Sequence, residues 1–122
     1  MSKKTKKNRI AIIDGLRTPF CKAGSHLAYL EADELGALCV KELLQRSYVN
    51  VEDIQEIIIG NVSQPVKAAN IARVVALKAG LSQHIPAFSV SRNCASGMQS
   101  VTEACNTIHA GQAETVLAGG TE

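Results

Sequence analysis

The sequence has few of the residues that mark nucleic-acid-binding or membrane proteins. It contains no tryptophan, two tyrosines and two phenylalanines, so a basic face with exposed aromatic side chains is not expected. From residue 8 onward, nine basic residues stand against 11 acidic ones. No apolar run is long enough to span a membrane, and Asp14 interrupts the run 10–13 too soon for a signal peptide. We therefore expect a soluble protein that does not bind nucleic acid and does not span a membrane.

Basic residues gather at the start of the chain, where Lys3, Lys4, Lys6, Lys7 and Arg9 supply five of the 13. A short block of like charge is typical of a solvated segment. Residues 1–8 are therefore predicted to be a basic, flexible leader. The whole chain is 46% hydrophobic, so residues 9–122 can form one packed domain. This composition excludes a disordered or collagen-like protein.

The chain has no CxxC pair, and its three histidines share no metal-ligand spacing with each other or with a cysteine. A zinc site is therefore not expected, and neither is any other metal site. Four cysteines without an export signal indicate reduced thiols in the cytoplasm rather than a disulfide framework. The motifs GxGxxG and GxxxxGK[ST] are also absent, so Gly119-Gly120 is interpreted as a turn rather than a phosphate loop.

Strands and helices alternate along the predicted chain. Apolar runs predict strands at 9–14, 54–59, 87–91 and 115–118, and helical spacing predicts helices at 33–46, 67–79 and 94–109. Isoleucines follow one another without alternation at 57–59, which indicates a strand covered on both faces, as in a parallel sheet. The predicted fold class is α/β, with a mostly parallel sheet flanked by helices.

Two apolar stripes are expected to face the core. One comprises Leu35, Leu38, Cys39 and Leu43, and the other comprises Met98, Val101, Cys105 and Ile108. Their spacing places each set on one side of a helix. Cys39 and Cys105 are therefore interpreted as packing residues, and Cys21 lies in a loop with no visible activating neighbour.

Cys94 is the candidate nucleophile, because it lies where a predicted strand ends and a helix begins. In α/β sheets, ligands collect at such junctions. The helix dipole and the unpaired amides of the first turn favour a thiolate and would stabilise an oxyanion. Ala95, Ser96 and Gly97 are small enough to let a substrate approach the sulfur. On spacing alone, a buried packing cysteine remains the alternative.

The histidines offer no obvious general base for Cys94. His84 precedes the strand that leads to Cys94, so it is expected at the far end of that strand. His26 lies in a loop and His109 ends a helix.

The residues around Cys94 carry a resemblance to a known family. The run VSRNCASGMQSVTEACNTI at 90–108 resembles the nucleophile-cysteine segment of the thiolases. RTPF at 17–20, GNVSQPVKAANIARVVALKAGL at 60–81 and AGQAETVLAGGTE at 110–122 resemble the same family in the same order. The segment KAANIAR at 67–73 is most similar to the corresponding segment of the 3-ketoacyl-CoA thiolases of fatty-acid β-oxidation. Cys21 and Ser25-His26 depart from the glycine-rich run that often follows RTPF.

The resemblance implies a thiolase-like layered fold, of which residues 9–122 would form part of the N-terminal domain. It assigns Cys94 as the nucleophile that cleaves a 3-ketoacyl-CoA, with coenzyme A as a substrate and with neither a metal nor a redox cofactor. It also implies a homo-oligomer formed through the thiolase dimer surface, or a subunit of a multifunctional β-oxidation complex.

Thiolases carry their activating histidine, second cysteine and asparagine-bearing oxyanion motif in segments that these motifs do not include. The resemblance therefore implies the opening portion of a thiolase, inactive by itself. Three alternatives remain: an acetyl-CoA C-acetyltransferase working in the condensing direction, a ketoacyl synthase with its cysteine on the same fold, and a non-catalytic remnant or assembly module. Chain-length preference is not predicted.

Overall fold

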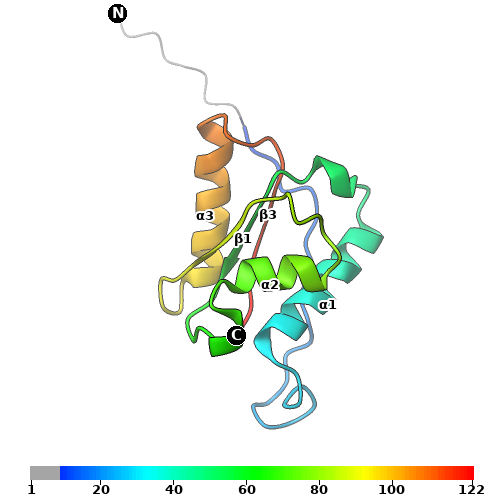
Figure 1. The fold of residues 1–122 in the computed structure, drawn as a ribbon, viewed down its shortest axis with the longest axis vertical. Coiled ribbons are helices and arrows are strands. Elements are labelled where there is room, and N and C mark those ends of the chain that lie inside the picture. The colour runs from blue at the N-terminus through cyan, green and yellow to red at the C-terminus, as the bar shows by residue number, and fades with distance from the viewer. Residues whose placement is uncertain (1–8) are drawn as a thin grey trace, which may run out of the picture.

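A computed structural model describes residues 9–122, so the predicted leader at 1–8 lies outside the described residues. The elements follow one another as α1 (Ala32–Arg46), the short 3-10 helix η1 (Val51–Asp53), β1 (Glu56–Gly60), the 3-10 helix η2 (Val66–Ala68), α2 (Ile71–Lys78), β2 (Ala87–Val90), α3 (Ser96–His109) and β3 (Val116–Gly120) (Figure 1). The predicted alternation of helices and strands is confirmed from residue 32 onward.

The three strands form one parallel sheet in the order β2-β1-β3. The register places Gly60 beside Val90 on one side and beside Gly120 on the other, so all three strands end at the same level. Helix α3 packs on one face of this sheet, while α2 packs on the other face and α1 packs against α2 (Figure 1). The predicted α/β class with a parallel sheet is confirmed.

The centre of the fold is β1, whose isoleucines are buried on both faces as predicted. Ile57 and Ile58 are fully buried and Ile59 nearly so. Ile57 and Ile59 pack in one apolar cluster with Ile71 and Val75 of α2. Ile58 points to the opposite side, toward α3, because successive side chains of a strand alternate between faces. The sheet is therefore sandwiched between helices.

The strand expected at 9–14 does not form, and no strand pairing within residues 9–122 includes it. This segment runs extended, with Ile12 85% and Ile13 68% exposed. A strand requires a neighbouring backbone to accept and donate its hydrogen bonds. The apolar side chains predicted a strand here, but no described strand pairs with the backbone of this segment.

The predicted core stripes of α1 and α3 are wrong in phase. Helix α1 buries Asp33, Ala37 and Val40, while Leu38 is 53% exposed. Helix α3 buries Ser96, Ser100 and Ala104, and Met98 is 69% exposed. The other residues of both stripes are half-buried. Small side chains allow the helix backbones to approach their neighbours closely, so the closest contacts fall beside the larger apolar residues.

Several predicted boundaries also shift. Helix α2 starts at Ile71 rather than at 67, because the Asn70 side chain caps it by accepting a hydrogen bond from the amide of Arg73. Helix α3 starts at Ser96 rather than at 94. Gly119-Gly120 lies within β3 instead of forming a turn. The predicted end of α3 at Gly111 is confirmed, since this residue has a φ of 72° directly after the helix C-cap.

Candidate active site

The carboxyl ends of the three strands meet beside Cys94. Cys94 lies in the connection between the end of β2 and the start of α3, and it is exposed. Residues 61 and 121, which follow β1 and β3, come to the same edge of the sheet because the strands are parallel and in register. The predicted strand-to-helix junction is therefore present, with an accessible thiol.

A tight turn at residues 92–96, called here the Cys94 turn, holds the cysteine. The amide of Ala95 donates to the carbonyl of Arg92 at 3.1 Å, and the amide of Ser96 donates to that of Asn93 at the same distance. Asn93 has a φ of 48°, a left-handed conformation that asparagine tolerates better than most residues. The backbone thus reverses immediately before the first turn of α3.

The buried hydroxyl of Ser96 closes this turn from within. It accepts from the amide of Arg92 at 2.7 Å and donates to the carbonyl of Asn93 at 2.7 Å. Ser96 is 4% exposed, so water competes little for these bonds. One side chain therefore fixes the backbone on the N-terminal side of Cys94.

Glycines allow the sheet to touch the start of α3. A Cβ on Gly60 would lie 2.3 Å from the carbonyl carbon of Ser96 and 2.7 Å from the amide nitrogen of Gly97. A Cβ on Gly120 would lie 3.1 Å from the α-carbon of Gly97. No larger residue fits at Gly60 without movement of one backbone. The Cys94 turn therefore rests directly on the end of β1, and the first turn of α3 rests on the end of β3.

The carboxylate of Glu122 joins the ends of β1 and β3. It accepts hydrogen bonds from the amides of Val62 at 2.9 Å and Ser63 at 2.7 Å, and from the side-chain amide of Asn61 at 3.3 Å. We call this arrangement the Glu122 clasp. The bonds from Val62 and Ser63 hold the pKa of Glu122 below its ordinary value, with the Val62 amide as the largest cause.

Charged and polar groups line the exposed side of α3 next to the cysteine. Arg92 donates to Gln99 at 2.8 Å, and Gln99 donates to Glu103 at 2.6 Å.

Within residues 9–122, neither Gly97 nor Met98 donates its amide to a backbone carbonyl. Amides of this kind at a helix start carry the positive end of the helix dipole. The site can therefore favour negative charge on a sulfur or on an oxyanion.

The other three cysteines lie elsewhere in the fold. Cys39 is half-buried in α1, where its thiol donates to the carbonyl of Leu16 at 3.4 Å and burial raises its pKa. Cys105 is half-buried in α3, and Cys21 is exposed in the loop before α1. Of the four, Cys94 alone precedes the first turn of a helix.

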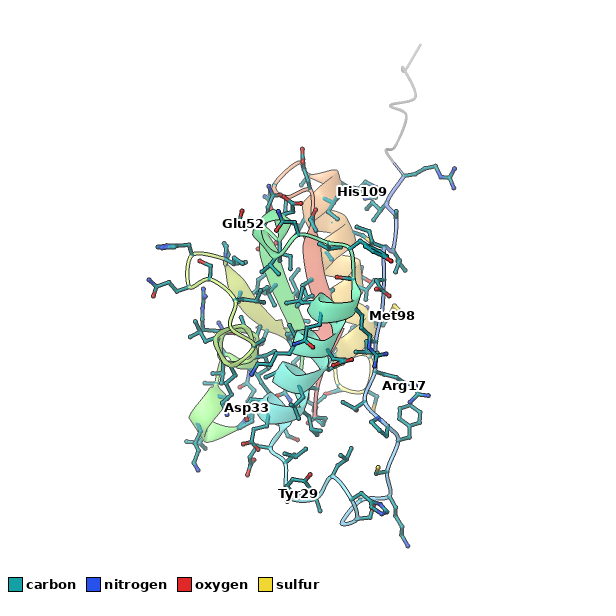
Figure 2. All side chains as sticks on the ribbon, turned by 90° about the vertical axis from the view of Figure 1, so that its right-hand side faces the viewer. Arg17, Tyr29, Asp33, Glu52, Met98 and His109 are labelled. Carbon is teal, nitrogen blue, oxygen red and sulfur yellow. The ribbon has the colours of Figure 1, made fainter. Side chains whose placement is uncertain are left out.

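The structure does not bring the histidines of the helix and strand framework to Cys94. His84 precedes β2, at the end of the sheet opposite to the cysteine. His109 is the last residue of α3 and lies at the far end of that helix (Figure 2), about 20 Å along the axis from its start. His26 is exposed in the loop before α1. The fold therefore keeps His84 and His109 away from Cys94.

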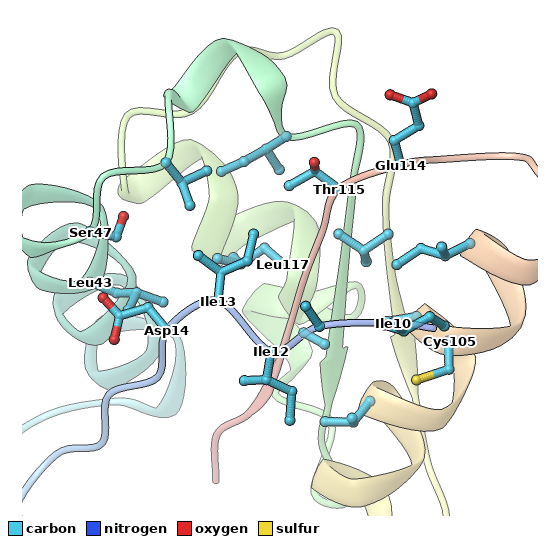
Figure 3. A pocket seen from close by; sticks show the side chains of 18 of the residues that line it. Ile10, Ile12, Ile13, Asp14, Leu43, Ser47, Cys105, Glu114, Thr115 and Leu117 are labelled. Carbon is cyan, nitrogen blue, oxygen red and sulfur yellow. The ribbon is translucent and has the colours of Figure 1, made fainter. Parts of the chain in front are cut away.

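An apolar cavity of about 210 Å³ lies along the C-terminal part of α3 and does not include Cys94. The extended segment 10–14 crosses its mouth (Figure 3). Val101, Cys105 and Ile108 line it together with Leu43 of α1. These four half-buried side chains therefore face this cavity rather than a closed core.

Metal and membrane features are absent from the part of the chain that the structure describes. No group of three or more histidine, cysteine, aspartate or glutamate side chains in residues 9–122 could hold a metal ion. None of the helices described there has the length and apolar composition needed to cross a membrane.

Comparison with known proteins identifies the family. The model of the thiolase N-terminal domain matches residues 10–122. The chain belongs to the thiolase family. It is 42% identical over 115 residues to the 3-ketoacyl-CoA thiolases of Yersinia pestis (strain Pestoides F) and Yersinia pseudotuberculosis (serotype O:1b, strain IP 31758). The match covers 94% of this chain and 26% of theirs, so the chain spans about a quarter of the length of these relatives.

A solved structure supports the same assignment. The acetyl-CoA acetyltransferase of Bacillus anthracis superposes with a TM-score of 0.76 at 32% sequence identity. The superposition covers 87% of this chain and 25% of that one. The thiolase fold inferred from the motifs is therefore confirmed, and the family match favours a thiolase over a ketoacyl synthase.

Sequence reasoning missed the residues that support the cysteine. Asn61 and Glu122 meet across 61 positions of sequence, and no local pattern indicates that pairing. Ser96 was noted only for its small size, although a serine at the start of a helix commonly bonds the preceding backbone. Gly60 ends β1, and the sequence does not indicate that its lack of a side chain allows the strand to touch the backbone of Ser96.

Proposed function

We propose that this chain supplies the nucleophile of a 3-ketoacyl-CoA thiolase and that the nucleophile is Cys94. The observation that carries the proposal is the exposed thiol immediately before α3, in a chain that is 42% identical to named 3-ketoacyl-CoA thiolases. The substrates are a 3-ketoacyl-CoA and free coenzyme A, and no metal or redox cofactor takes part.

The reaction divides into two acyl transfers at Cys94. The thiolate attacks the 3-keto carbon, the carbon–carbon bond next to it breaks, and the leaving acetyl-CoA carbanion takes up a proton. The sulfur then holds the shortened acyl group as a thioester. The thiol of coenzyme A loses its proton to a base, which replaces the proton given to the carbanion, and attacks this thioester as a thiolate. Acyl-CoA is released and the Cys94 thiolate is regenerated. Covalent catalysis suits the reaction because it replaces one difficult cleavage by two easier steps.

The Cys94 turn supports the first of these steps. Amides at the start of α3, such as those of Gly97 and Met98, can stabilise negative charge that develops on the attacked carbonyl oxygen. The small residues Ala95 and Gly97 leave room for the thioester. A base for the thiol and a proton donor for the carbanion must come from other residues, so the 122 residues alone are proposed to be inactive in thiolysis.

A second candidate is acetyl-CoA C-acetyltransferase activity in the condensing direction. The observation that favours it is the structural match to the Bacillus anthracis acetyl-CoA acetyltransferase. Condensation reverses the same steps, so it requires the same cysteine. A non-catalytic assembly module is the remaining alternative, and it requires no reactivity at Cys94 at all.

The proposal extends to the assembly and location of the protein. We propose a homo-oligomer, or a subunit of a multifunctional β-oxidation complex, in the cytoplasm. Four cysteines without a disulfide among the described residues fit a reducing compartment.

Acyl transfer to the sulfur tests the proposal without requiring a full catalytic cycle. The chain is incubated with excess acetyl-CoA, and peptide mapping by mass spectrometry locates the acetyl group. We expect the adduct on Cys94, its loss in Cys94→Ala and its retention in the matched variant Cys21→Ala. Equal labelling of Cys21 and Cys94, or no adduct on Cys94, would contradict the proposed nucleophile and favour the assembly module.

A further inference from the structure

The loop after β1 is held more firmly than its exposed position suggests. Val62 is 43% exposed, yet its amide and that of Ser63 both donate to the Glu122 carboxylate. Hydrogen bonds to a charged acceptor are about twice as strong as neutral ones. Glu122 therefore fixes the backbone that immediately follows Gly60.

Asn61 shows how strongly this arrangement orients its neighbours. The residue is 2% exposed, and its side-chain amide donates to the carbonyl of Thr121 at 2.8 Å and to Glu122 at 3.3 Å. Its Oδ1 atom is buried and meets no donor within the described residues. A buried acceptor without a partner is costly. The side chain is nevertheless turned with its amide toward Glu122 and Thr121, so these acceptors determine its orientation.

Backbone bonds connect the same residues to both neighbouring strands. The amide of Asn61 donates to the carbonyl of Val90 at 3.0 Å, and the amide of Thr121 donates to that of Gly60 at 3.1 Å. Gly60 in turn touches the backbone of Ser96. A continuous path of contacts therefore runs from Glu122 through the end of β1 to the residue that closes the Cys94 turn.

We infer that Glu122 is a positioning residue for Cys94: its carboxylate holds the Asn61–Ser63 loop, and with it the surface of β1 on which the Cys94 turn rests. The inference builds on the proposed role of Cys94 as the nucleophile. Glu122 is not placed in contact with the substrate. It acts by keeping the amides at the start of α3 aligned with the sulfur.

Site-specific alkylation separates positioning from general stabilisation. The rate of reaction of each cysteine with iodoacetamide is measured at neutral pH in the unmodified chain and in Glu122→Gln. We expect Cys94 to react about two- to fivefold more slowly in the variant, the range set by loss of a favourable helix-end alignment. Cys21, which is also exposed, should react at an unchanged rate.

The matched control is Glu52→Gln. Glu52 is an exposed carboxylate in η1 at the opposite end of the molecule from the Cys94 turn (Figure 2), so this variant should alkylate like the unmodified chain. Faster alkylation of Cys39 and Cys105 in Glu122→Gln would indicate general loosening and would overturn the positioning role. An unchanged Cys94 rate would overturn it as well.

Hydrogen exchange provides a test that needs no variant. In the unmodified chain, the amides of Val62 and Ser63 should exchange markedly more slowly than other exposed loop amides, such as that of Gly24. Exchange at the same rate as Gly24 would show that the clasp does not persist in solution. This measurement and the alkylation rates do not depend on thiolase activity, so failure of the clasp is distinguishable from failure of the proposed reaction.

Discussion

The end of β1 touches the start of α3 through the backbones of Gly60 and Ser96, since a Cβ on Gly60 would lie 2.3 Å from the Ser96 carbonyl carbon. Ser96 also bonds the residues on the N-terminal side of Cys94. The position of the sulfur is thus tied to the central strand as well as to its own helix. Any side chain at position 60 must displace one of these elements.

Gly60→Ala is therefore expected to destabilise the domain. The nearest atoms are backbone atoms, which move only with their whole element, so we expect a loss of about 2–4 kcal/mol in the free energy of unfolding. For a domain of this size, that corresponds to a melting temperature lower by roughly 10 °C. Thermal unfolding followed by far-UV circular dichroism measures the change.

Gly97→Ala is the matched control for Gly60→Ala. It lies in the same contact region, but a Cβ on Gly97 would meet nothing within 4 Å. Because alanine is favoured over glycine in a helix by up to about 1 kcal/mol, this variant should melt at or above the temperature of the unmodified chain. Equal melting temperatures for both variants would show that the Gly60 contact yields easily.

A pair of aspartate substitutions tests which side of α3 faces the sheet. Ala104 is 7% exposed, so Ala104→Asp buries an unpaired charge and should cost about 3 kcal/mol or more. Val101 is half-buried at the open cavity, and its new carboxylate can reach water. Val101→Asp should therefore cost about 1 kcal/mol. Urea unfolding measures both losses in the free energy of unfolding. A larger loss for Val101→Asp than for Ala104→Asp would show that the apolar stripe of α3 is its buried side.

The apolar pattern predicted where the helices lie in the chain better than it predicted which of their residues are buried. Periodicity located α1 and α3 because large apolar residues recur along them at helical spacing, but α3 buries the small residues Ser100 and Ala104 most deeply. Hydropathy measures how much apolar surface a side chain offers, whereas close packing of a helix on strands selects small residues. The strand expected at 9–14 shows the complementary limit, since pairing depends on a partner elsewhere in the chain.

The candidate site likewise contains one part that the sequence could predict and one part that it could not. Cys94 could be found from the sequence because a strand, small residues and a helix are consecutive there. The Glu122 clasp could not, because it joins residues about 60 positions apart through backbone amides, which every residue except proline possesses. Only the parallel register of β1 and β3 brings Glu122 beside Val62 and Ser63.

The ion pair between α1 and α2 predicts a pH-dependent contribution to stability. Asp33 Oδ2 lies 2.5 Å from Lys78 Nζ, and Asp33 is 8% exposed. The hydrogen bond to Lys78 lowers the pKa of Asp33 despite its burial, and the same bond raises the pKa of Lys78. The stabilisation is therefore complete above the ordinary aspartate pKa and below the ordinary lysine pKa. It is lost as the pH falls through the lowered aspartate value or rises through the raised lysine value.

Asp33→Asn checks this dependence, because it removes the charge and retains the shape of the side chain. The stability difference between the unmodified chain and the variant should be largest near neutral pH and should shrink in acid. Urea unfolding at a series of pH values measures it, and the titration of Glu122 cancels in the difference. A difference that stays constant into acid would show that the pair contributes no charge-dependent stability.

Cys94 is predicted to be the most reactive thiol of the chain. Cys21 provides a built-in comparison, since both residues are exposed and differ in their position relative to a helix start. Limited iodoacetamide labelling at neutral pH should modify Cys94 first, then Cys21, with the half-buried Cys39 slowest because burial raises its pKa. Preferential labelling of Cys21 would remove the argument for activation by the helix end.

The isolated chain is predicted not to catalyse thiolysis, although it holds the proposed nucleophile. Cleavage of a 3-ketoacyl-CoA requires a base for the thiol and a proton donor for the carbanion, whereas His84 and His109 lie at the wrong ends of β2 and α3. Catalytic groups that act as a unit leave little activity when one is missing. The loss of acetoacetyl-CoA absorbance in the presence of coenzyme A measures turnover, with Cys94→Ala as the control. Turnover that disappears in Cys94→Ala would show that a base lies closer than the fold indicates, and His26 in the loop before α1 would be the first residue to substitute.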